Sequence, residues 1–188
     1  MPNNVKITIK GKEEFLNQFR SDERIFDFEK IIPIPEELLN TIKGSGENDD
    51  PLRNRILIKK YGSANWYDWS VDNWGTKWNA YSEEEDEGER VFQTAWSPPE
   101  GIFNKLLEKF PNEEWEVIYQ EEQGWGSHFK VIKGKLIEIE KWDIAGVDYL
   151  DEDHDIFLCT KSGGYGTTMK VEEGRYYSGE KEKEVGKP

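Results

Sequence analysis

The chain has 188 residues, of which 34% are charged and 35% hydrophobic, and its formal net charge at pH 7 is −14. This length suits one domain, or one domain with an appendage. Eight tryptophans offset the low apolar share, because each ring buries about 150–250 Å². No apolar run approaches the roughly 18 residues of a membrane helix, and no signal-peptide pattern opens the chain. One cysteine, Cys159, excludes an internal disulfide framework. We expect a folded, cytoplasmic protein.

The first elements follow from periodicity. Residues 5–9 alternate between apolar and polar types, which predicts a half-buried strand. Residues 12–20 place apolar side chains at helical spacing and predict a helix. Residues 25–32 predict a second strand, which Pro33 ends. Pro35 then opens a helix whose first turn carries acidic residues at its positive end.

A tryptophan-rich helical insertion follows, over about residues 35–75. Residues 53–61 predict a short helix, and residues 65–74 predict another, with two tryptophans and an asparagine on one face. Residues 76–81 look extended. Residues 82–89 are strongly charged and predict a flexible hairpin loop.

Strands dominate the next part of the chain. Residues 90–96 predict a strand, and Ser97-Pro98-Pro99 ends it and starts a helix with an apolar stripe over residues 102–110. Three further strands are predicted by alternation, at residues 115–119, 129–132 and 136–139.

This order of elements predicts the fold class. Strand–helix–strand occurs twice, which is typical of an α+β, ferredoxin-like antiparallel sheet with helices on one face. We assign this domain to residues 1–142 and an acidic, Gly-rich C-terminal extension to residues 143–188. Within the extension, residues 156–159 and 171–177 are candidate strands, and residues 180–188 predict disorder.

Three sequence blocks indicate a family. They are FDFEKIIPIP at residues 26–35, NWGTKWNA at residues 73–80 and FQTAWSPP at residues 92–99. The chain resembles the YubB/Api-like ferredoxin-fold family of phage and conjugative-plasmid proteins over roughly residues 5–140. The resemblance implies a ferredoxin-like fold and a mobile-element origin, and it assigns neither an activity nor catalytic residues. The chain departs from the family pattern at Glu29, where we expect a small amide, and beyond about Trp142.

The negative charge is concentrated in the second part of the chain. Residues 1–80 hold 12 basic and 13 acidic side chains, whereas residues 81–188 hold 13 basic and 26 acidic ones. Such a surface repels phosphate backbones, which disfavours direct nucleic-acid binding, and it attracts basic proteins. The plainer alternative is that the charges only keep the protein soluble.

The resemblance implies a protein of a phage or plasmid, and with this asymmetry added we predict a non-enzymatic accessory protein. It would bind a host protein with a basic surface, such as a defence or DNA-handling component, by occlusion or nucleic-acid mimicry. The predicted protein-binding residues are Glu83, Glu84, Glu85, Asp86, Glu87, Asp151, Glu152, Asp153 and Asp155.

The alternative function is a single-stranded nucleic-acid-binding module in the near-neutral first part of the chain. Exposed aromatic rings beside amides and a lysine can stack on bases, although the helical spacing of Trp66 and Trp69 favours a place in the core. The candidate ligand-binding residues are Trp66, Tyr67, Trp69, Asn73, Trp74, Lys77, Trp78 and Asn79. A basic cluster would assist them, at Arg53, Arg55, Lys59 and Lys60.

Enzyme and metal signals are weak. Residues 151–155 carry carboxylates at calcium-loop spacing, but Ile156 and Ser162 occupy the positions where glycine and a bidentate glutamate are needed. His128 and His154 lie far apart in the sequence, without a recognisable nucleophile partner. We therefore predict no catalytic residue, no metal and no cofactor, and the sequence leaves the oligomeric state open.

Overall fold

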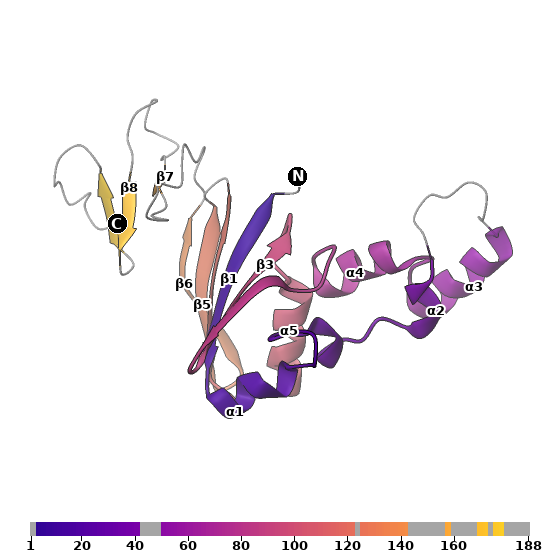
Figure 1. Ribbon diagram of the computed structural model, residues 1–188, viewed down its shortest axis with the longest axis horizontal. Coiled ribbons are helices and arrows are strands. Elements are labelled where there is room, and N and C mark those ends of the chain that lie inside the picture. The colour runs from indigo at the N-terminus through magenta and orange to yellow at the C-terminus, as the bar shows by residue number, and fades with distance from the viewer. Residues whose placement is uncertain are drawn as a thin grey trace.

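The computed structural model describes residues 3–41, 50–122 and 125–142, and three short strands at residues 157–158, 169–172 and 175–178. Its main feature is a six-stranded antiparallel sheet in the order β2-β3-β1-β4-β5-β6 (Figure 1). The strands are β1 (Asn4–Gly11), β2 (Tyr81–Asp86), β3 (Glu89–Ala95), β4 (Trp115–Glu121), β5 (Gly126–Ile132) and β6 (Lys135–Trp142).

Four of these strands have the ferredoxin-like order. β1 lies between β3 and β4, so that Ile7 faces Phe92 on one side and Tyr119 on the other. Helices connect β1 to β2 and β3 to β4, which gives two interlocked β-α-β units. β5 and β6 extend the sheet beyond β4. The predicted α+β, ferredoxin-like class is confirmed.

Five α-helices are described. They are α1 (Glu13–Leu16), α2 (Glu36–Leu39), α3 (Pro51–Tyr61), α4 (Trp66–Trp74) and α5 (Glu100–Lys109), with two 3₁₀ turns, η1 (Asn17–Phe19) and η2 (Phe28–Lys30). In Figure 1, α5 covers one face of the sheet, α4 lies beside α5, and α2 and α3 project away from the sheet. The helical insertion is thus present, between η2 and β2. No helix among the described ranges is long and apolar enough to cross a membrane.

The predicted strand over residues 25–32 is wrong. This segment contains η2, because the Asp27 side chain accepts a hydrogen bond from the Glu29 backbone N–H and caps the turn. The Phe28 N–H donates to Asn79 Oδ1, 2.9 Å away, and not to a neighbouring strand. Phe26 and Phe28 are both fully buried. Phe26 and Phe28 are two positions apart, as two buried residues of a strand would be. Here an irregular loop directs both rings into the core.

The predicted hairpin loop over residues 82–89 is also wrong. Most of it is β2, the strand that completes the first β-α-β unit, and only the turn at Glu87 and Gly88 connects it to β3. β2 lies at the edge of the sheet, and most of its side chains remain in contact with water. It therefore needs no apolar alternation, which is the signal on which sequence-based strand prediction rests.

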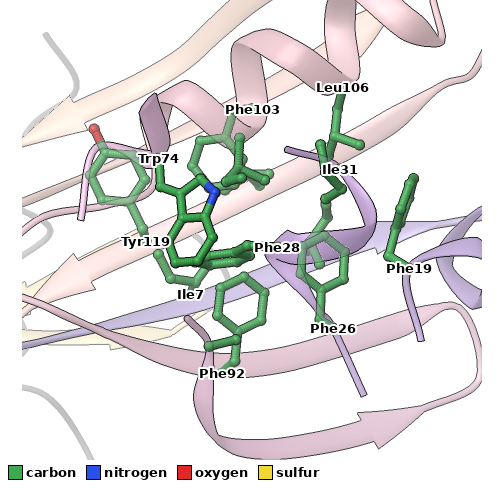
Figure 2. Close-up of a cluster of buried hydrophobic side chains, with 14 of the residues drawn as sticks. Ile7, Phe19, Phe26, Phe28, Ile31, Trp74, Phe92, Phe103, Leu106 and Tyr119 are labelled. Atoms are coloured by element: carbon green, nitrogen blue, oxygen red, sulfur yellow. The ribbon is translucent and has the colours of Figure 1, made fainter. Parts of the chain in front are cut away.

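The core joins the sheet, α5 and the insertion through aromatic rings. Phe26 stacks on Phe92 with ring centroids 5.0 Å apart, and Phe28 meets Trp74 edge-on at 5.6 Å. Figure 2 shows these rings gathered between the sheet and α5. The Trp74 indole N–H also donates to the Ile32 carbonyl, at 2.8 Å. This hydrogen bond ties the start of the insertion to its end.

A second, three-stranded antiparallel sheet lies in the extension. Its strands are β7 (Phe157–Leu158), β8 (Met169–Glu172) and β9 (Arg175–Ser178). β7 falls within the candidate strand at residues 156–159, and the candidate strand at residues 171–177 spans the β8–β9 hairpin. The acidic residues 151–155 and the segment 180–188, which we predicted to be disordered, lie outside the described residues.

Candidate functional site

The structure divides the acidic run of β2 into two groups. Glu83 accepts a hydrogen bond from the Phe26 backbone N–H at 2.6 Å and lies 3.7 Å from the Arg24 guanidinium. Glu85 forms an ion pair with Arg20 and faces Arg90 across the hairpin. These two carboxylates are therefore largely neutralised by the protein itself.

The other carboxylates of the run face solvent. Glu84, Asp86 and Glu87 are exposed, and no lysine or arginine of the described ranges forms an ion pair with them. Asp86 Oδ1 accepts only the neighbouring Glu87 N–H, at 2.8 Å. We call these three residues the hairpin carboxylates. The remaining predicted protein-binding residues, Asp151, Glu152, Asp153 and Asp155, lie outside the described residues.

A buried arginine fixes the hairpin in place. The Arg90 side chain is only 1% exposed, and its guanidinium donates to Glu13 Oε1 at 2.6 Å and to Asn17 Oδ1 at 2.9 Å. Glu13 also accepts the Gly88 N–H of the turn, at 2.8 Å. The hydrogen bonds from Arg90 and Gly88 lower the pKa of Glu13 from 4.5 to about 2. The hairpin is thus anchored to α1.

The tryptophan-rich candidates are also split. Trp69 and Trp74 are buried in the core, so their rings are closed to a ligand. Asn73 donates to the Trp69 carbonyl, and Asn79 bridges the loop by accepting from the Phe28 N–H and donating to Asp27 Oδ1. These four residues shape the fold. Trp66 is half-buried and packs against the core cluster.

The basic cluster lies on one helix of the insertion. Arg53, Arg55, Lys59 and Lys60 all lie on α3. Figure 1 places α3 at the outer end of the insertion, away from the ends of the strands. These cations therefore lie on a different helix from the aromatic candidates of α4.

A smaller group of aromatic residues does come together around a lysine. The Lys77 ammonium lies 4.1 Å from the Trp78 ring centroid, 4.9 Å from that of Trp96 and 5.6 Å from that of Tyr67. Trp78 is 40% exposed and Trp96 is 47% exposed. We call these four residues the aromatic–lysine site. It combines large accessible rings with a positive charge.

Hydrogen bonds hold the two backbone segments of this site side by side. Thr76 Oγ1 donates to the Ala95 carbonyl at 2.9 Å, and the Ser97 hydroxyl donates to the Gly75 carbonyl. Gly75 ends α4 at φ +86° and packs so closely that an added Cβ would lie 3.0 Å from the Glu100 nitrogen. These contacts place Lys77 and Trp78 next to Trp96.

Trp96 has a strained backbone, with φ +71°. A non-glycine residue in this region costs of order 1–3 kcal/mol, and such strain is concentrated at functional sites. The Trp96 N–H donates to the Asn3 carbonyl at 2.8 Å, which helps to hold the conformation.

Sequence reasoning missed Trp96 as a site residue. Strict alternation along β3 places Trp96 on the same side as Phe92 and Thr94, which are both buried. The left-handed backbone at Trp96 ends the alternation and directs the ring to solvent. The sequence did contain one indication that the Trp96 ring leaves the core. Trp96 directly precedes Ser-Pro-Pro, and such a segment ends a strand.

The described residues contain no group of three His, Cys, Asp or Glu side chains that could hold a metal. His128 contacts Glu116, whose other carboxylate oxygen lies 3.3 Å from Lys130. Partial burial raises the pKa of Glu116, but the hydrogen bonds from His128 and Lys130 outweigh it and lower that pKa overall. His128 therefore has a structural partner on the sheet.

The fold and the comparisons agree on the class of protein. The strand order and the helix-covered face define a ferredoxin-like α+β protein. Residues 75–160 match a family model described as the ferredoxin-like domain in Api92-like protein. That range spans β2 to β7 and leaves β1, α1 and the insertion outside. No curated protein and no solved structure matches the chain.

Proposed function

We propose that this chain is a non-enzymatic accessory protein of a phage or plasmid, and that it binds a basic host protein through the hairpin carboxylates. The observation that carries the proposal is the division of the acidic run. Glu84, Asp86 and Glu87 are exposed and without an ion-pair partner among the described residues, whereas Glu83 and Glu85 are paired internally.

The position of these carboxylates suits recognition of a basic groove. The hairpin is anchored by the Arg90–Glu13 ion pair, so its charges are presented without a large ordering cost on binding. Residues 81–188 add a long-range negative field, with 26 acidic against 13 basic side chains. Such a field accelerates association with a positively charged partner and weakens as salt is added. Carboxylates seated in a groove meant for phosphates would occlude it.

The test is a pull-down with the full chain from nuclease-treated host lysate, at low and high salt. The variant Glu84→Gln/Asp86→Asn/Glu87→Gln removes the hairpin carboxylates. The matched control Glu100→Gln/Glu108→Gln/Glu114→Gln removes the same charge from exposed positions on and after α5. We expect salt-sensitive capture of a specific basic protein by the wild type and the control, and its loss in the hairpin variant.

Two results would contradict the proposal. Equal losses in both triple variants would show that only bulk charge matters. A partner that stays bound at high salt and binds the hairpin variant normally would show that contacts elsewhere carry the interaction.

A further inference from the structure

Two large rings of the aromatic–lysine site remain open to solvent although their backbone is firmly held. Trp78 and Trp96 are 40% and 47% exposed. Accessible aromatic rings on a rigid frame are typical of binding surfaces, where they supply contact area at a low entropic cost. We propose that this site binds single-stranded nucleic acid, with one base stacked on Trp78 and the neighbouring base on Trp96.

Lys77 supplies the positive charge that a strand requires. Its ammonium lies over both the Trp78 ring and the Trp96 ring, at 4.1 and 4.9 Å from the centroids. Lys77 covers one face of each ring, so a base would stack on the face that Lys77 leaves open, and the adjacent ammonium would attract the phosphates of the strand. No carboxylate of the described ranges forms an ion pair with this ammonium, so its charge is available to a phosphate.

The rings are also oriented before a ligand arrives. The strained φ of +71° directs Trp96 away from the core, and the Thr76–Ala95 hydrogen bond fixes the distance between the two segments. Base–aromatic stacking tolerates any sequence, because every base has a π-face. A duplex hides those faces, so the site selects single strands.

The overall charge of the molecule limits this binding. With 39 acidic and 25 basic side chains, most of the surface repels a phosphate backbone. We therefore expect weak affinity that rests on stacking and falls further with salt. The sign of the charge also distinguishes this site from the hairpin carboxylates, which would repel a nucleic-acid strand and attract a basic protein.

The test measures binding of the full chain to a fluorescein-labelled oligothymidylate of about eight nucleotides, a length within the usual site sizes, by fluorescence anisotropy at low salt. Trp78→Ala and Trp96→Gly should each weaken binding by about tenfold to a hundredfold, the loss of one stacked base. Glycine is chosen at position 96 because it accepts the positive φ and keeps the backbone path. Lys77→Gln should reduce the slope of log affinity against log salt by about 0.7.

Matched controls lie on the opposite edge of the sheet. Ile139→Ala and Lys135→Gln change exposed residues of β6 and should leave binding unaltered. The hairpin variant Glu84→Gln/Asp86→Asn/Glu87→Gln should bind the oligonucleotide at least as well as the wild type. Unfolding midpoints of all variants check that each one is folded.

Further ligands distinguish stacking from charge and from small nucleotides. An abasic oligonucleotide of the same length, thymidine monophosphate and the matching duplex should all bind much more weakly than the single strand. Equal binding of the abasic strand, or no binding of the thymidylate at all, would overturn the proposal. It would equally be overturned if Trp78→Ala and Trp96→Gly weakened capture of a partner protein and left oligonucleotide binding intact, because the site would then dock protein.

Discussion

Arg90 is a fully buried cation whose charge is balanced mainly by one carboxylate. Its guanidinium donates to Glu13, and Glu85 lies 3.7 Å from its Nε atom. The Nε proton itself has no hydrogen-bond partner. A buried charge that loses its partner is strongly destabilising, so the stability of the hairpin depends on the ionisation of Glu13.

The pH dependence of stability should reveal this pair. The folded pKa of Glu13, about 2, lies below its ordinary 4.5. Ionised Glu13 thus stabilises the protein fully above about pH 4.5, and this contribution is lost as the pH falls toward 2. Glu13→Gln should lower the free energy of unfolding at neutral pH, and its deficit relative to the wild type should shrink across that window. Urea denaturation at several pH values measures this, and a deficit that is independent of pH would refute the role of the charge.

Residues of the candidate site show where sequence reasoning stops. Trp78 and Lys77 were among the candidates, because an aromatic ring beside a lysine is visible in one short block. Trp96 lies 18 positions beyond Trp78, and only the hydrogen bonds between residues 75–76 and 95–97 bring it near. Long-range contacts of this kind leave no local pattern.

Among the elements, α4 and α5 meet at a point that has no room for a side chain. A Cβ atom on Gly101 would lie 2.0 Å from the Asn73 carbonyl oxygen, at the end of α4. Replacing glycine by alanine inside a helix normally stabilises it by about 0.5–1 kcal/mol. Here the close approach of two backbones reverses that preference.

Gly101→Ala should therefore destabilise the protein by about 1–3 kcal/mol, the usual cost of overpacking. Asn104→Ala, at an exposed position of the same helix, is the control and should leave stability unchanged or raise it slightly. Urea unfolding midpoints compare the two variants. A rise in both midpoints would show that α4 shifts to make room for the added methyl group.

Elements with an apolar face were predictable from sequence, and the polar edge strand β2 was not. β1, β3, β4 and the stripe of α5 alternate or repeat because one side of each is buried. β2 has no buried side. The loop around η2 shows the alternation of a half-buried strand but is not a strand. The predicted fold class is nevertheless correct, because two errors cancel. The strand wrongly predicted at residues 25–32 takes the place of β2, which was predicted to be a loop, in the first β-α-β unit.

The whole molecule carries many more carboxylates than its basic side chains can neutralise. At pH 7 the net charge is −14, and self-repulsion of this kind destabilises the compact state. Adding salt screens the repulsion over distances near a Debye length, about 10 Å at 0.1 M.

Thermal stability should therefore rise with salt at neutral pH. Raising sodium chloride from low to physiological concentration should increase the unfolding midpoint by about 2–4 °C, the shift that 1 kcal/mol produces in a chain of this size. The control is the same titration near the calculated isoelectric point of about 4.7, where the effect should vanish. A midpoint that falls with salt at pH 7 would show that attractive ion pairs outweigh the net repulsion.

The central position of β1 has a consequence for how the chain is made. β1 is synthesised before both strands with which it pairs, β3 at residues 89–95 and β4 at residues 115–121. The local hairpins β2–β3, β4–β5 and β5–β6 can form without β1, but β3 and β4 belong to one sheet only when β1 pairs with both of them. A fragment that begins at residue 75, where the family match begins, would hold two separate half-sheets, and a peptide carrying Asn4–Gly11 would be the piece that joins them.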